Sequence, residues 1–161
     1  MRSRFALLAV LAFALAAAAS AQSKISGTMQ CKSQPPSPVP VGDAPNHAVA
    51  IVKSQCTWTK PATIGGVATK DGDDTIVSDM TGDTAADHGY SVGTMANGDK
   101  IHVKFGGSSR SKDGKPVSGE GTWSFTGGTG KFQGLKGKGT YRGTANPDGT
   151  ITYTIDGDSS M

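Results

Sequence analysis

The sequence predicts an all-β protein, an antiparallel β-barrel of about eight strands. All 23 glycines follow Ala21, together with many threonine, serine and valine residues. No segment of this part of the chain sustains the 3.6-residue apolar period of an amphipathic helix. Short alternating segments separated by glycine, proline, asparagine or aspartate recur instead, as they do where strands are joined by tight turns.

Eight segments have the composition and alternation of strands: 24–32, 48–58, 74–80, 88–96, 100–106, 117–126, 136–144 and 150–156. Residues 34–46 separate the first two segments and contain five of the eight prolines. Because proline has no N–H to give to a ladder, we expect these residues to form an extended surface loop outside the sheet.

The N-terminal residues have the pattern of a secretory signal peptide. Arg2 and Arg4 precede an apolar run that ends in Ala19-Ser20-Ala21, an A-x-A cleavage site. The run of about fifteen apolar residues is too short to span about 30 Å of hydrocarbon, so we expect no membrane insertion. The prediction is a signal peptide over residues 1–21, a single barrel domain over 22–161, and a secreted or periplasmic protein.

The distribution of charge along the sequence does not form the basic patch that an anionic partner would bind. The formal net charge is +3, and Arg2 and Arg4 supply two of these charges. The rest of the chain is therefore near +1, with acidic and basic residues interspersed. This distribution argues against nucleic acid and against an anionic membrane surface as partners.

Cys31 and Cys56 are the two cysteines of the chain. In an exported protein we expect them to form a disulfide that joins the strands on either side of the proline-rich loop. Closing a loop of about 26 residues would contribute roughly 3 kcal/mol. The alternatives are a metal site and a catalytic thiol, but the sequence around the cysteines supplies neither a second pair of ligands nor a nearby histidine.

The spacing of the histidines and acidic residues does not indicate a metal or cofactor site elsewhere in the chain. The three histidines, His47, His88 and His102, do not form a triad, and we expect neither a metal nor a cofactor. The acid-rich segment 70–74 lacks the ligand positions of a calcium loop, and we expect a turn there. A Gly-x-Ser-x-Gly elbow is also missing from the sequence, which removes the commonest signal for a serine hydrolase.

Two turns predict the register of two hairpins. Asn97-Gly98 predicts a two-residue type I′ turn that pairs Tyr90 with Phe105. This register would form an inner face from Tyr90, Val92, Ile101, Val103 and Phe105, with Lys100, His102 and Lys104 outside.

The second turn, over residues 146–149, predicts a three-residue loop closed by Gly149. Asn146 then faces Thr150, and Tyr141 pairs with Ile155. The inner face of this hairpin would carry Tyr141, Ile151, Tyr153 and Ile155, with Arg142 and Thr152 outside. In segment 117–126 the same alternation turns Trp123 and Phe125 inward.

A glycine-rich segment follows the sixth predicted strand: Gly127-Gly128-Thr129-Gly130-Lys131-Phe132-Gln133-Gly134. It is not a P-loop, because Phe125 stands where the first glycine belongs and Phe132 where serine or threonine should follow the lysine. The pattern Gly-Gly-Thr-Gly-x-Phe-x-Gly between two strands resembles a late-strand motif of the allene oxide cyclase and dirigent barrel families. The resemblance implies an eight-stranded barrel with an apolar pocket, which in the plant families holds a reactive lipid epoxide or a phenolic radical.

The resemblance covers about residues 119–156 and carries no catalytic residue over to this chain, since the match is confined to the glycine motif. For the segment itself, we expect Phe132 and Leu135 to plug one end of the barrel. The bacterial exported relatives that it implies are small barrels without an assigned reaction.

Three functions remain open. The first is a binding module that holds a small apolar or aromatic molecule inside the barrel, against His88, Tyr90, Phe105, Trp123, Phe125, Tyr141 and Tyr153. The second is an isomerase or cyclase that uses His88, Tyr90 or Asp79 in the same cavity, with His88 near one mouth of the barrel. The third is a structural or envelope-interaction protein whose barrel is filled by its own side chains.

Overall fold

The strands of the protein form one antiparallel sheet in a computed structural model that describes residues 22–161. The predicted signal peptide lies outside the described residues. The strands and the single 3₁₀ turn within this range are β1 (Ser23–Ser33), β2 (Val39–Pro40), β3 (His47–Lys60), β4 (Thr63–Ile64), β5 (Val67–Thr81), β6 (Thr84–Met95), β7 (Lys100–Lys112), β8 (Lys115–Gly128), η1 (Gly130–Phe132), β9 (Lys136–Ala145) and β10 (Ile151–Ser160).

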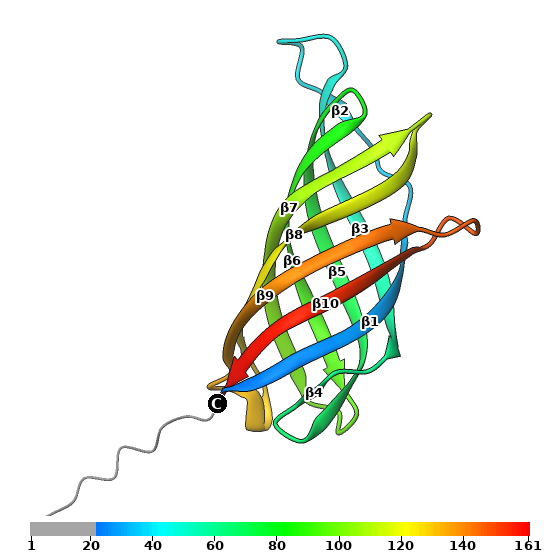
Figure 1. Cartoon of the computed structure of the whole chain (residues 1–161). Helices are drawn as coiled ribbons and strands as arrows, with labels where there is room; N and C mark the ends of the chain where they lie inside the picture. The colour runs from blue at the N-terminus through cyan, green and yellow to red at the C-terminus, as the bar shows by residue number, and fades with distance from the viewer. Residues whose placement is uncertain (1–21) are drawn as a thin grey trace, which may run out of the picture.

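Eight of these strands close into a barrel, as the sequence predicts (Figure 1). The ring runs β1, β3, β5, β6, β7, β8, β9, β10 and back to β1, and β3 closes it by pairing with both β1 and β5. Every neighbouring pair is antiparallel. Strands β2 and β4 are short additions to this ring. Within residues 22–161, no helix is long and apolar enough to cross a membrane.

The strands are longer than predicted, and one predicted turn is wrong. Residues 70–74, expected to form a turn, lie inside β5, where residues 71–74 pair with β3 on one side and with β6 on the other. Sheet pairing on both sides overrides the turn preference of aspartate and glycine. Because strand residues alternate, Asp73 points outward while Asp74 points into the barrel.

The proline-rich loop does join the sheet, contrary to prediction, at one place. Val39 and Pro40 form β2 and pair with Val49 and Ala48 of β3. Proline is tolerated there because β2 is an edge strand, in which one side of the backbone is free of partners. The rest of the segment is exposed, as a surface loop would be.

The hairpin of β9 and β10 has the predicted register. The N–H of Asn146 donates to Thr150 O, and the N–H of Gly149 donates to Asn146 O, with Gly149 at φ +82°. Tyr141 pairs with Ile155, and Gly143 with Tyr153. Arg142 is exposed on the outer wall, as expected.

The register predicted for the hairpin of β6 and β7 is wrong by one residue. The N–H of Met95 donates to Asp99 O and the N–H of Gly98 to Met95 O, so the loop has three residues rather than two. Tyr90 therefore pairs with Lys104. It is 64% exposed, and Val92 is 44% exposed, so both lie on the outer wall. The prediction for β7 holds, since Ile101, Val103 and Phe105 belong to the core or pack against it.

Space inside the barrel explains the small residues on the inner face of β6. A Cβ added to Gly89 would lie 2.7 Å from the ring of Phe105, and one added to Gly93 would lie 2.7 Å from Ile101. The large side chains of β7 thus cover the inner face of β6, which leaves no room there for Tyr90 or Val92.

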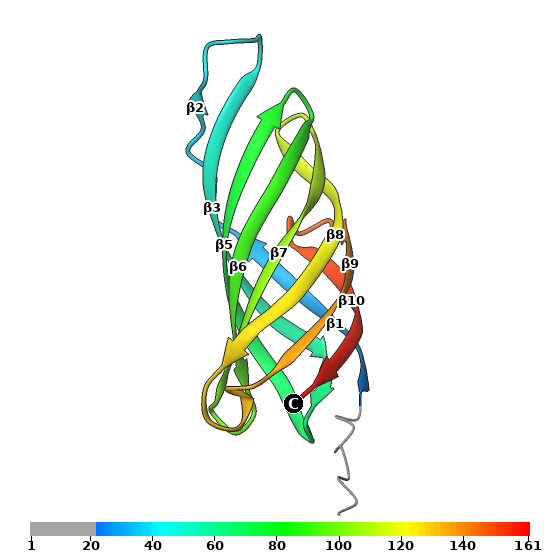
Figure 2. The same ribbon diagram turned by 90° about the vertical axis from the view of Figure 1, so that its left-hand side faces the viewer.

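The glycine-rich segment between β8 and β9 lies at one end of the barrel (Figure 2), the end at which Figure 1 labels β4. Phe132 and Leu135 are 0% and 2% exposed and pack with Ile64 and Met95, which confirms the predicted plug. Lys131 Nζ donates to Gly65 O at 2.6 Å and so ties the plug to the turn between β4 and β5.

Candidate functional site

A cavity of about 130 Å³ lies inside the barrel, and core residues that include Ile64 and Ile101 line part of it. An engineered cavity of about 150 Å³ in another protein is large enough to bind benzene, so this space is of the order that a small ring needs. The cavity is half open, and apolar surface predominates in its lining. The barrel is therefore not completely filled by its own side chains.

One wall of the cavity is aromatic. Five of the seven predicted site residues line it, and they come from strands β7 to β10: Phe105, Trp123, Phe125, Tyr141 and Tyr153. Their rings contact one another in two groups: the centroids of Trp123 and Phe125 are 4.9 Å apart, and that of Tyr141 lies 6.1 Å from Phe105 and 5.8 Å from Tyr153. Trp58 of β3 also lines the cavity, so both tryptophans of the chain face it.

The other predicted site residues lie on the outer wall. Tyr90 and His88 are exposed, because the hairpin register turns this face of β6 outward. Asp79 is also exposed, and its Oδ1 lies 2.8 Å from Nε2 of His47. The assignment of these three residues to the cavity is wrong, and with it the isomerase chemistry that depended on them.

Glycines make room for the tyrosines of the aromatic wall. Tyr141, Gly121, Gly107 and Asp87 form one row of paired residues across β9, β8, β7 and β6. A Cβ added to either glycine would lie 2.6 Å from the hydroxyl of Tyr141. The phenol ring therefore extends across β8, and its hydroxyl reaches β7. Strand β7 pairs in turn with β6, the strand that carries Asp87.

The opposite wall is acidic, and sequence reasoning missed it. Asp74 of β5 and Asp87 of β6 both line the cavity. In the ring of strands, β5 and β6 stand across the barrel from β9 and β10, which carry Tyr141 and Tyr153. The hydroxyl of Ser78 donates to Asp87 Oδ1 at 2.5 Å. Asp87 is thus held in place by a hydrogen bond rather than by a cation.

Burial raises the pKa of Asp74 to about 6, from its usual 3.8, because the low-dielectric interior disfavours the carboxylate. A hydrogen bond from the Ser91 side chain opposes this rise, and the negative charge of Asp73 adds to it. Burial also raises the pKa of Tyr141 to about 12, with smaller contributions from Asp87 and Asp74, and raises that of Tyr153. Both phenols remain neutral hydrogen-bond donors at neutral pH.

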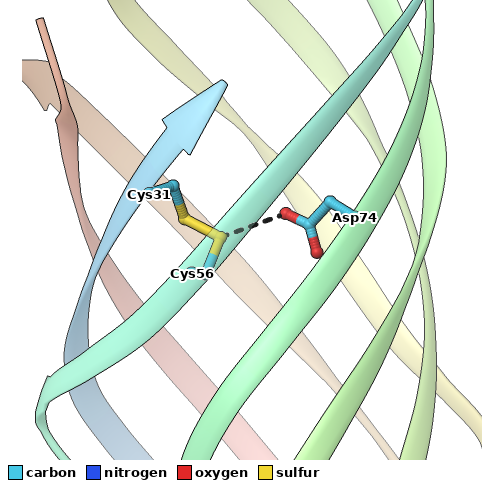
Figure 3. Close-up of side chains that lie close together, drawn as sticks. All are labelled: Cys31, Cys56 and Asp74. Atoms are coloured by element: carbon cyan, nitrogen blue, oxygen red, sulfur yellow. Dashed lines mark hydrogen bonds between the residues drawn. A yellow bond between two sulfur atoms is a disulfide. The ribbon is translucent and has the colours of Figure 1, made fainter. Parts of the chain in front are cut away.

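The predicted disulfide between Cys31 and Cys56 is present, with an S–S distance of 2.01 Å and a Cα–Cα distance of 4.0 Å. Figure 3 shows the carboxylate of Asp74 pointing at this bond, with Oδ2 3.4 Å from Cys56 Sγ. A disulfide sulfur has no hydrogen, so the contact is a hydrogen bond only when Asp74 is protonated and donates. Disulfides are typical of oxidising compartments outside the cytoplasm.

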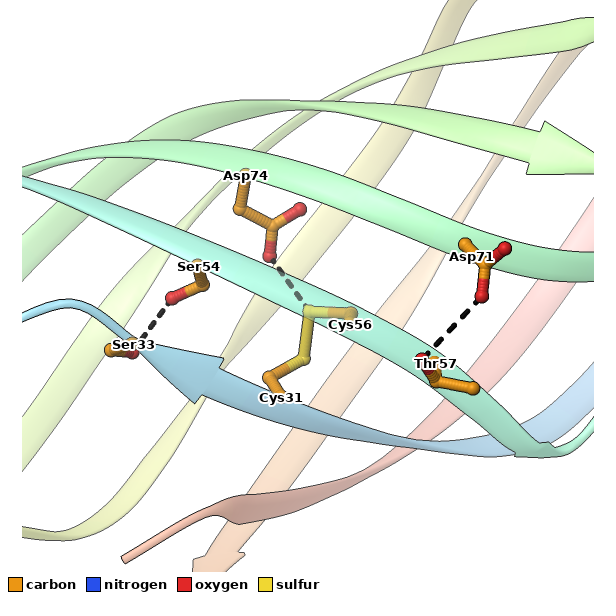
Figure 4. Close-up of a disulfide and its surroundings, with 7 residues drawn as sticks. All are labelled: Cys31, Ser33, Ser54, Cys56, Thr57, Asp71 and Asp74. Atoms are coloured by element: carbon orange, nitrogen blue, oxygen red, sulfur yellow. Dashed lines mark hydrogen bonds between the residues drawn. A yellow bond between two sulfur atoms is a disulfide. The ribbon is translucent and has the colours of Figure 1, made fainter.

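The two sulfurs and Asp74 lie within 4.8 Å of one another, as metal ligands would. Sulfurs bonded to each other are not thiolates, however, so this group is not a metal site. Figure 4 shows how the neighbouring residues hold the strands at this level. The hydroxyls of Ser33 and Ser54 lie 2.6 Å apart on one side of the disulfide, and Thr57 donates to Asp71 on the other.

Comparisons with known proteins support the fold. No protein-family model matches this chain, and no curated protein matches it. Among solved structures, it is similar to a protein of unknown function from the DUF3224 family of Shewanella oneidensis MR-1. The TM-score is 0.51 at 13% sequence identity, and the match covers 85% of this chain and 97% of the other. At this identity the likeness establishes a shared barrel fold and leaves function to the residues of the cavity.

Proposed function

We propose that this protein is an exported binding module that holds a small, largely apolar or aromatic molecule inside its barrel. The observation that carries the proposal is the half-open cavity of about 130 Å³ with its aromatic wall. Concave sites with apolar linings and a few convergent polar groups are the usual form of small-molecule sites. The disulfide and the predicted signal peptide support export.

The cavity favours this function over a filled structural barrel. Six aromatic side chains line the free space, and β6 contributes only Asp87, Ser91 and Gly93 to its lining, none of which is a large apolar residue that would fill it. The isomerase of the allene oxide cyclase kind depended on His88, Tyr90 and Asp79, and these residues lie on the outer wall. The acids in the cavity include Asp74 and Asp87.

The proposal is tested by titrating the protein with benzyl alcohol and following tryptophan fluorescence, because Trp58 and Trp123 both line the cavity. We expect a saturable change. Val103→Phe places a larger side chain in the cavity and should abolish it. Val92→Phe makes the same change on the outer wall and should leave it intact.

Native mass spectrometry of protein purified from its own host gives a second readout, in which a retained small molecule is expected. The absence of both a saturable signal and a retained molecule would contradict the proposal.

A further inference from the structure

We propose that the molecule held in the barrel is an organic cation, whose positive charge lies at the wall that carries Asp74 and Asp87 while its apolar body packs against the aromatic wall. This inference rests on the proposed binding function and names the chemical class of the ligand. Three observations carry it: the charge of the lining, the absence of internal partners for the two acids, and the aromatic surface across from them.

The lining of the cavity carries charge of one sign. Asp71, Asp74 and Asp87 line it, and no lysine, arginine or histidine of residues 22–161 does. The site therefore repels carboxylates and phosphates and attracts cations. Because the cavity is half-closed and mostly apolar, this attraction is stronger than it would be at the protein surface.

Asp71 pairs with Lys70, but neither Asp74 nor Asp87 has a positively charged partner in the described part of the chain. The ion pairs there join Lys24 with Asp158, His47 with Asp43 and Asp79, Lys70 with Asp71, and Arg142 with Glu120. Buried carboxylates are normally paired, because an unpaired charge in a low dielectric lowers stability. A cationic ligand would supply the missing partner, and a cost to stability that serves binding is common at functional sites.

The wall that faces the acids suits a cation as well. Tyr141 and Tyr153 stand across the barrel from β5 and β6, with ring centroids 5.8 Å apart and an angle of 73° between their planes. Aromatic faces attract ammonium groups through their quadrupole, and most strongly where water is excluded. An ammonium group between these rings and the carboxylates would meet negative potential on both sides.

The test compares benzylammonium with benzyl alcohol, which has nearly the same size and shape but no charge. We expect benzylammonium to bind at least about tenfold more tightly at pH 7.5, a difference of about 1.4 kcal/mol. Equal binding of the two probes would overturn the cation proposal and leave the binding function standing. If neither probe binds, both proposals fail.

Variants identify the acids that are responsible for the preference for the cation over benzyl alcohol. Asp74→Asn and Asp87→Asn should each reduce the preference for the cation several-fold, with little effect on benzyl alcohol. Asp73→Asn removes the same charge from the neighbouring outward-facing position of β5, and it should keep the preference. An Asp73→Asn loss as large as that of Asp74→Asn would show that general surface charge, rather than the cavity, selects the cation.

A measurement on the unaltered protein protects the test against variants that do not fold. Lowering the pH from 7.5 to 5 protonates Asp74, so benzylammonium affinity should fall while that of benzyl alcohol stays constant. Next to Asp74 are the disulfide of β1 and β3, the Ser91 side chain of β6 and the charge of Asp73, and Asp74 acts in turn on the two tyrosines of β9 and β10. Cation affinity that does not change with pH would count against Asp74 as the contact.

Discussion

The hydroxyl of Tyr141 lies against Gly107, two strands away, because the intervening Gly121 has no side chain to block it. Gly121→Ala should therefore destabilise the protein. Its Cβ would lie 2.2 Å from Gly106 O and 2.6 Å from the Tyr141 hydroxyl. Forcing an atom into such a packed site costs about 1–3 kcal/mol, which urea unfolding can measure.

Gly106→Ala is the matched control for this prediction. Gly106 lies next to Gly107 on β7, but an added Cβ would meet only Asp87 O at 3.6 Å, an ordinary contact. We expect this variant to be as stable as the wild type or slightly more stable, by up to about 1 kcal/mol. Equal losses in both variants would mean that strand glycines matter here for a reason other than the room they leave for Tyr141.

Asp74 should make the stability of the protein depend on pH in an unusual direction. Its pKa is about 6 in the folded protein and near 3.8 when exposed, so the folded state holds the proton more tightly. The free energy of unfolding therefore falls as the pH rises from about 4 to about 6, and it stays lowered above that window. At about 1.36 kcal/mol per pKa unit, the loss is about 3 kcal/mol.

Asp74→Asn removes this loss, so the variant should be more stable than the wild type at pH 7.5. The difference should shrink towards zero at pH 4, where both side chains are neutral. Urea unfolding at the two pH values measures it, with Asp73→Asn as the control on the outer face. A difference that is the same at both pH values would show that Asp74 keeps an ordinary pKa in the folded protein.

The sequence was sufficient for the fold class and for one hairpin in full. The turn at Asn146 to Gly149 allows one loop length, since Pro147 fixes φ and Gly149 closes the loop with a positive φ. The turn at Asn97-Gly98 allows two loop lengths, one of two residues and one of three. In the structure Gly98 has φ +88° while Asn97 is not in the left-handed region, so the turn matches the other hairpin rather than a type I′ turn.

The acidic wall was missed for a related reason. Hydrophobic alternation pointed Tyr90 and Val92 inward, whereas in the barrel large residues of one strand cover small residues of the next. The signal available in the sequence was the alternation of Gly89, Ser91 and Gly93, whose small side chains mark the crowded inner face of β6. Asp87 lies two residues before Gly89 and therefore on the same face. The expected turn over residues 70–74 hid Asp74 in the same way, because a residue in a turn has no inner face.

The disulfide should contribute about 3 kcal/mol to stability, because it closes a loop with a sequence separation of 25. Replacing Cys31 and Cys56 together by alanine should lower the free energy of unfolding by that amount. Ser33→Ala with Ser54→Ala removes the neighbouring hydrogen-bonded pair without breaking a covalent link, and it should cost about 1 kcal/mol. Similar losses in the two double variants would mean that the cross-link adds nothing beyond local packing.

His47 should hold the proline-rich loop against the barrel in a pH-dependent way. Its Nδ1 lies 2.5 Å from Asp43 Oδ1 of the loop, and its Nε2 lies 2.8 Å from Asp79 Oδ1 of β5. The hydrogen bonds to Asp43 and Asp79 raise the pKa of His47 above 6.5. Its contribution to stability is therefore complete below about pH 6.5 and is lost as the pH rises through the raised pKa.

Asp79→Asn replaces one of the two carboxylate acceptors by a neutral amide and should move the pKa of His47 back towards 6.5, which NMR titration of the imidazole measures directly. Cleavage of the loop over residues 34–46 by a protease of broad specificity should then begin at a lower pH than in the wild type. Asp83→Asn removes a charge from the neighbouring turn, and Asp83 does not contribute to the shift of His47. If both variants lower the His47 pKa equally, the net charge of this end of the barrel sets it, and the two hydrogen bonds do not.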